Sequence, residues 1–189
     1  MNTPAHLIVG ASFFARSDRK GTLLAALAGA MAPDLSLYLM VGVSIWVMGI
    51  APQIVFRDYY YSDAWQSVFA VDNSFILWST LLCLALWRSW PRVFAFSGAG
   101  LLHLALDFPL HTHDARMHFW PLTDWVFFSP VSYWDVRAYA GIVGPTEFLF
   151  SLGCAVVLWR RFRDLWVRVG VGVLMVLETL STSVWQFIF

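Results

Sequence analysis

The segment 103–118, HLALDFPLHTHDARMH, concentrates groups capable of metal chemistry in otherwise apolar surroundings. It contains four of the chain's five histidines, and His103 and Asp107 are four residues apart within it. On a helix, this spacing puts both side chains on one face. Imidazole and carboxylate groups are costly beside hydrocarbon, so their clustering indicates a functional site. Because they are also the usual ligands of zinc, the segment predicts a divalent metal site, with zinc as the expected ion.

Three more histidines, His111, His113 and His118, follow in the same segment with Asp114. We expect at least one of these groups to bind the metal or to orient a ligand by a hydrogen bond. The others are then solvated loop residues.

Two candidates lie far away in the sequence. His6 belongs to the first apolar segment, and its alternative is an interfacial position near a chain end. Asp34 follows Pro33, and its alternative is to cap a helix broken at that proline. The complete predicted ligand set is His6, Asp34, His103, Asp107, His111, His113 and His118.

The consistent enzyme chemistry for these residues is metal-assisted hydrolysis. A nearby carboxylate, Asp34 or Asp114, is the expected general base. The nucleophile motif Gly-x-Ser-x-Gly and the zinc motif His-Glu-x-x-His are both absent from the sequence.

The composition indicates an integral membrane protein. Of the 189 residues, 59% are hydrophobic and only 13% are charged, against about a quarter charged in a soluble domain. The simplest organisation is one integral-membrane domain, 1–189, with membrane lipid as its partner. A formal net charge of zero gives no reason to expect nucleic acid as a partner. Cys83 and Cys154 both lie in apolar stretches and are expected to be inert thiols.

Apolar segments predict an all-α, polytopic membrane helix bundle of about six transmembrane or partly re-entrant helices. The segments are roughly 4–15, 21–49, 74–87, 93–110, 141–159 and 167–189. A spanning helix needs about 20 residues. The first and third segments are shorter, so we expect them to be tilted, partly re-entrant or packed inside the bundle.

Charge placement predicts the orientation of the chain. With the N-terminus outside, inner loops hold nine of the 12 basic residues, as the positive-inside rule requires. Both termini and two loops, at about 50–73 and 111–140, are then extracytoplasmic, and a bacterial inner membrane is the expected location. The N-terminal segment has no basic leader, so we keep it in the mature fold. The aromatic loops form either an interfacial belt or a lid over a lipid-facing pocket.

This topology predicts where the polar groups meet. His6, Asp34, His103 and Asp107 all fall in the outer half of the bundle, beneath the histidines of 111–118. Glu147 either joins them or caps the fifth helix. Glu178, in the last segment, is a lesser candidate.

At these residues the chain resembles the YdjM-like family of LexA-binding, inner-membrane-associated, metal-dependent hydrolases. The matching elements are His6 with Gly10, the run PDLS at 33–36, and HLALD at 103–107. The Pro-Asp element and the N-terminal histidine are also similar, more distantly, to zinc-dependent phospholipase C. The resemblance implies a metal-dependent hydrolase.

The chain departs from the family pattern at two places. Ser36 stands where the family has the second carboxylate of Pro-Asp-x-Asp. The family's central His-Arg…Thr-His-Ser element has no counterpart. Either the histidines of 111–118 substitute for it, or the metal site is reduced.

The expected function is hydrolysis of a phosphoester or ester bond of a lipid-like substrate near the extracytoplasmic face. One alternative is a non-enzymatic membrane protein that uses a structural metal, or the His/Asp cluster itself, in assembly. Another is a small proton-coupled transporter using Asp34, Glu147 and Glu178.

Overall fold

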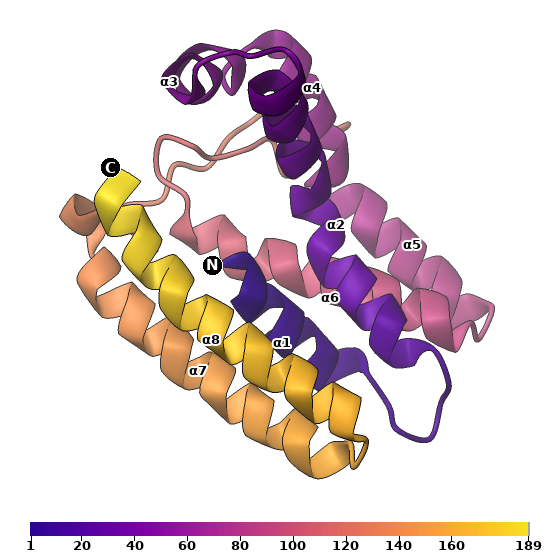
Figure 1. Cartoon of the computed structure of the whole chain (residues 1–189). Coiled ribbons are helices and arrows are strands. Elements are labelled where there is room, and N and C mark those ends of the chain that lie inside the picture. Colours follow the sequence, from indigo (N-terminus) through magenta and orange to yellow (C-terminus); the bar gives the residue numbers. More distant parts are fainter. Residues whose placement is uncertain (189) are drawn as a thin grey trace.

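The chain folds into a bundle of helices that run back and forth (Figure 1). The structure is a computed structural model that describes the backbone of residues 1–188 and the side chains of residues 1–181. The main helices are α1 (Thr3–Phe14), α2 (Thr22–Gly42), α4 (Asp63–Asp72), α5 (Phe75–Trp87), α6 (Pro91–Asp107), α7 (Ala140–Arg161) and α8 (Leu165–Ile188). Shorter elements are α3 (Pro52–Ile54), π-helical turns at Val43–Val47 and Val55–Tyr59, and 3-10 turns at Phe108–Leu110 and Val136–Ala138. All regular structure in the described residues is helical, which confirms the predicted all-α class.

Long apolar helices confirm that the bundle suits a membrane. Among the described residues, four segments are long and apolar enough to cross a bilayer: Thr22–Val47, Asp63–Trp87, Pro91–Leu110 and Ala140–Arg161. A count of about six spans is therefore not confirmed. The short α1, with 12 residues, reaches only about 18 Å at the helical rise.

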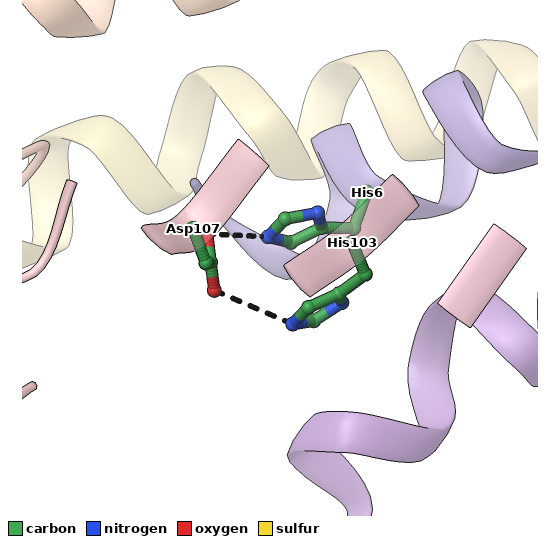
Figure 2. Close-up of side chains that lie close together, drawn as sticks. All are labelled: His6, His103 and Asp107. Atoms are coloured by element: carbon green, nitrogen blue, oxygen red, sulfur yellow. Dashed lines mark hydrogen bonds and ion pairs between the residues drawn. The ribbon is translucent and has the colours of Figure 1, made fainter. Parts of the chain in front are cut away.

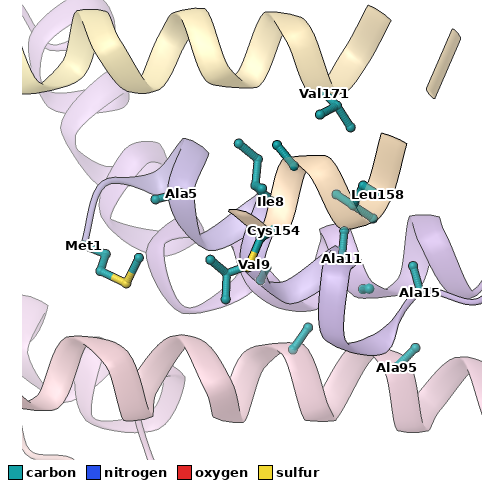
Figure 3. Close-up of a cluster of buried hydrophobic side chains, with 14 residues drawn as sticks. Met1, Ala5, Ile8, Val9, Ala11, Ala15, Ala95, Cys154, Leu158 and Val171 are labelled. Carbon is teal, nitrogen blue, oxygen red and sulfur yellow. The ribbon is translucent and has the colours of Figure 1, made fainter. Parts of the chain in front are cut away.

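The short helix α1 lies inside the bundle and packs against α2, α6, α7 and α8 (Figure 1). The sequence predicts that this short first segment is tilted, partly re-entrant or packed inside the bundle, and the structure shows it packed inside. Ala5, Ile8 and Val9 of α1 are fully buried in a core made mostly of small side chains (Figure 3). Small residues let membrane helices approach closely, and this closeness supplies the packing energy that lipid cannot.

Two glycines allow the helices that carry the polar groups to touch. A Cβ on Gly29 of α2 would lie 1.9 Å from the carbonyl oxygen of Phe96 in α6. A Cβ on Gly10 of α1 would lie 2.8 Å from the Cβ of Ala30 in α2. The backbones of α1, α2 and α6 therefore meet at one place.

Two expectations about the chain between these helices are wrong. First, α2 continues without a break through Pro33, so Asp34 does not cap a helix. Second, the segment 50–73 is largely helical rather than a loop. Within it, α4 begins at a Ser62 cap whose hydroxyl accepts from the Trp65 N–H. It lengthens the short third apolar segment into a possible span, Asp63–Trp87.

The two ends of the bundle differ in charge. The links α1–α2, α5–α6 and α7–α8 lie at one end (Figure 1), and nine of the 12 basic residues lie in or beside them. Arg92 donates to the Lys20 carbonyl at 3.2 Å, and Arg161 to the Ser12 and Ala15 carbonyls at 2.6 and 2.7 Å. These bonds tie the links together. The N-terminus and the irregular segment 111–139 lie toward the other end.

Candidate metal centre and its cavity

Three helices bring His6, Asp34, His103 and Asp107 together, as the sequence predicts. His103 and Asp107 lie one turn apart on α6, and the His6 ring from α1 stacks on the His103 ring with centroids 3.6 Å apart. His6 Nε2 is 2.8 Å from Asp107 Oδ1, and His103 Nε2 is 3.3 Å from Asp107 Oδ2 (Figure 2). Asp34 Oδ1, from α2, lies 3.8 Å from His103 Nε2. Neither ring is more than 1% exposed.

The hydrogen bonding of His103 fixes which ring nitrogen is available. Its Nδ1 donates to the carbonyl oxygen of Ala30 at 2.7 Å. In the neutral ring, Nε2 is then an unprotonated acceptor, and it has no hydrogen-bond partner. That lone pair faces the carboxylates of Asp107 and Asp34. A lone pair facing two carboxylates requires a cation, either a proton on Nε2 or a metal ion.

The donor set fits a divalent metal. Ligand atoms of His6, His103 and Asp107 all lie within 4.8 Å of one another. Zinc binds imidazole nitrogen and carboxylate oxygen at about 2.0–2.2 Å, which separates neighbouring ligands of a tetrahedral site by roughly 3.3 Å. The Nδ1 bond of His103 is the type of outer contact that orients a ligating histidine. These three residues would hold the metal, with Asp34 next to them.

His111 extends the cluster from the irregular segment. Its Nε2 is 3.2 Å from Asp107 Oδ2, and its Nδ1 is 2.7 Å from Asp114 Oδ2. Burial alone would lower the pKa of His111, but the two carboxylates raise it to about 9. The Asp114 carboxylate also accepts from the Trp134 indole at 3.1 Å. Asp114 thus holds the His111 ring in place, and its expected role as a general base stays a prediction.

The structure does not bring His113 or His118 to the cluster. His113 is exposed, with its ring edge-on to Trp134. His118 is buried, but its Nδ1 donates to the Arg116 carbonyl at 2.8 Å and its ring packs against Phe75 and Phe108. Burial lowers the pKa of His118 to about 4. His113 lines the cavity beside the cluster but forms no bond with the cluster residues, and spacing alone does not distinguish it from His111.

Glu147 and Glu178 form a separate polar cluster around Asn2. The Asn2 backbone N–H donates to Glu147 Oε1 at 2.5 Å, and its side-chain amide donates to Glu178 Oε1 at 3.2 Å. Glu147 lies in the second turn of α7 and is not a cap. Glu178 is fully buried. A sealed carboxyl group gives no path for water, which counts against the transporter alternative.

Sequence reasoning missed several groups at the cluster. The Met1 amino group forms an ion pair with Asp107. The Thr3 hydroxyl donates to Asp34 Oδ2 at 3.0 Å and is 2.5 Å from the Tyr38 hydroxyl. Only the Tyr38 hydroxyl could have been predicted from the sequence, because Tyr38 follows Asp34 by one turn on α2.

A cavity of about 270 Å³ opens beside the cluster. Asp34, Asp107 and His111 lie at its polar side, and Arg116 also lines it. Its apolar wall includes Leu37, Tyr38, Val41, Phe56 and Tyr133. The site therefore combines a possible metal centre with room for a largely apolar ligand.

Comparison with known proteins adds no identification: the chain matches no protein-family model, no curated protein and no solved structure. The resemblance to the YdjM-like family stays a prediction.

Proposed function

We propose that this chain is a membrane-embedded, metal-dependent hydrolase of a phosphoester or ester bond in a lipid-like substrate. One observation carries the proposal: Nε2 of the buried His103, whose Nδ1 donates to the Ala30 carbonyl, faces two carboxylates beside a largely apolar cavity. A divalent cation, with zinc preferred for this nitrogen and oxygen set, would supply Lewis acidity and lower the pKa of a nearby water.

The roles of the chain's own residues follow from their contacts. His6, His103 and Asp107 hold the cation. Asp34 lines the cavity and accepts the Thr3 hydroxyl with Oδ2, so it is positioned to accept a proton from water as general base. Asp114 orients His111 next to Asp107.

The first test is the metal content of the full chain, purified without a metal-binding tag. We expect bound zinc in the unaltered protein and its loss in His103→Gln and Asp107→Asn, because each removes one ligand. His113→Gln is the matched control: it removes an exposed histidine of the same segment and should keep the metal. Absence of any divalent metal from the unaltered protein would refute the proposal.

The second test is hydrolysis. Short-chain phosphoester and carboxylic ester lipids should be cleaved, a chelator should stop the reaction, and zinc should restore it. Asp34→Asn should lower turnover by about 10²-fold or more, the typical contribution of a general base, while keeping the metal.

A non-enzymatic assembly role is the second candidate, because Asp107 already has cationic or imidazole partners on both oxygens, among them Met1 and His111. This alternative predicts a folded, metal-free protein whose cluster variants lose stability rather than turnover.

We also propose that both termini and the segment 111–139 are extracytoplasmic in a bacterial inner membrane. The basic links at the opposite end of the bundle support this orientation through the positive-inside rule. The cavity would then open near the extracytoplasmic face.

A further inference from the structure

Arg116 is a buried cation for which the proposed hydrolysis has no use. Only 6% of the surface of this residue is exposed. One guanidinium nitrogen donates to Asn73 Oδ1 at 3.0 Å, and the group lies 4.6 Å from the centre of the Phe69 ring. Among the described side chains, no carboxylate forms an ion pair with it. Its Nε has no hydrogen-bond partner.

Such an arrangement is expensive unless an anion completes it. Removing a charge from water costs several kcal/mol in real proteins, and a good ion pair offsets this cost. Burial lowers the pKa of Arg116, but Tyr60, which shares a hydrogen bond with the guanidinium group, and the Asp34 carboxylate raise it, so Arg116 keeps its charge. A guanidinium group offers paired donors that match the oxygens of phosphate. The missing partner therefore has the chemistry of an oxyanion.

Because of the position of Arg116, an anion that pairs with it would lie in the cavity. Arg116 lines the same cavity as Asp34 and Asp107. An anion on the guanidinium group is therefore in the space that the proposed metal centre also faces. A neutral carboxylic ester would leave the buried charge unmatched.

The other side of the cavity suits a hydrocarbon chain. Leu37, Tyr38 and Val41 follow Asp34 by three, four and seven residues, and all four line the cavity from one face of α2. Ser181 lines it from α8. Tyr38 is 48% exposed, so the cavity is open beside this face of α2. A small hydrophilic phosphate compound would leave this apolar face in water.

We propose that Arg116 binds the phosphate group of an amphipathic phosphoester lipid, whose hydrocarbon chain leaves the cavity along Leu37, Tyr38 and Val41. This inference rests on the proposed function and narrows its substrate to lipids with a phosphate in the headgroup.

The test measures binding of dodecylphosphonate, whose carbon–phosphorus bond resists hydrolysis. The zinc-loaded full chain, in phosphatidylcholine nanodiscs, is titrated with the tritiated compound in a scintillation proximity assay. We expect saturable binding that Arg116→Lys weakens by about 10-fold or more, because a charge-assisted, paired hydrogen bond is lost. Arg137→Lys is the matched control, since Arg137 is exposed and pairs with Asp135; its binding should equal that of the unaltered protein.

A second variant covers the case in which Arg116→Lys does not fold. Asn73→Asp keeps the side-chain shape and gives Arg116 a carboxylate partner in place of the amide. It should weaken dodecylphosphonate binding by a similar factor, because the new ion pair competes with the ligand. Unchanged affinity in the folded variants would overturn the inference.

Competition separates the two parts of the ligand. Inorganic phosphate should displace the probe only at far higher concentration, and dodecanol should displace it poorly. Displacement by inorganic phosphate as effective as by unlabelled dodecylphosphonate would overturn the lipid assignment.

The zinc content is measured in the same samples, so that failure of the two proposals can be told apart. Arg116-dependent binding to a protein that holds no metal refutes the hydrolase alone, whereas metal retention with Arg116-independent binding refutes only this inference.

Discussion

At the scale of single residues, the cluster depends on the direction in which each ring is held. The carbonyl oxygen of Ala30 takes the Nδ1 proton of His103, and Asp114 holds His111 from the side away from Asp107. Both contacts aim an Nε2 atom at the same carboxylate. Fixed rings lose little freedom when a cation binds, so they favour tight and selective binding.

The burial of His118 predicts that the folded protein loses stability in acid. Burial lowers its pKa from the ordinary value of 6.5 to about 4 in the folded protein. Its stabilising contribution is therefore complete above pH 6.5 and is lost as the pH falls towards 4. The loss amounts to on the order of 3 kcal/mol. Thermal unfolding in detergent, measured across this range, should show a shallower acid destabilisation in His118→Gln.

The exposed His113 supplies the comparison for that measurement. His113→Gln also removes one histidine, but it opens no buried contact, so its acid destabilisation should match that of the unaltered protein. A His118→Gln variant with the full acid destabilisation would show that another group causes it.

At this scale the sequence predicted the residues that share a helix face and missed those that depend on distant contacts. The spacing of His103 and Asp107 indicated their joint role, and type alone singled out His6 and Asp34. Arg116 gave no such signal, because its burial arises from Phe69 and Asn73, more than 40 residues earlier in the chain. Hydropathy cannot show such a contact.

At the scale of elements, the site depends on how closely α2 approaches α6. The two backbones approach closely at Gly29, which lies one turn before Pro33 and Asp34. Since Asp34 and His103 come from these two helices, any separation of the helices also widens the cluster. Packing between small residues thus positions the polar groups.

Gly29→Ala should therefore disrupt both stability and metal binding. The added Cβ would clash with the Phe96 carbonyl at 1.9 Å, and backbone atoms cannot move aside as a flexible side chain does. We expect destabilisation of about 1–3 kcal/mol or more and reduced zinc content. Gly153→Ala in α7 is the matched control, because its Cβ would meet no atom within 4 Å. It should keep its zinc and unfold at the same temperature or a higher one.

The elements were predictable where the apolar pattern is continuous. Each of the six apolar segments overlaps one of the helices α1, α2, α5, α6, α7 or α8, with ends that differ by a few residues. The helix α4 was missed because Asp63 and Asp72 bound it and its aromatic residues suggested an interfacial loop. Asp63 in fact lies in the first turn, where a helix favours negative charge.

At the scale of the whole molecule, the bundle has a basic end and an end that carries the cavity. The segment 111–139 contributes His111 to the polar cluster, and the basic links lie at the opposite end of the helices from this segment (Figure 1). In a bilayer this asymmetry determines which compartment the cavity faces.

Single cysteines test this orientation. In a Cys83→Ala, Cys154→Ala parent, Thr123→Cys should react with a membrane-impermeant maleimide in intact cells, and Ser17→Cys only after the membrane is opened. Both positions are exposed, which makes them a matched pair. The reverse labelling pattern would place the cavity on the cytoplasmic side.

The central position of α1 has a consequence for biosynthesis. Helix α1 packs against two helices made much later, since Arg161 donates to the Ser12 and Ala15 carbonyls and Asn2 contacts Glu147 and Glu178. These partners on α7 and α8 are synthesised about 140 residues after α1, so a long loop must close before α1 is enclosed. Until α7 and α8 are in place, this side of α1 has no protein partner.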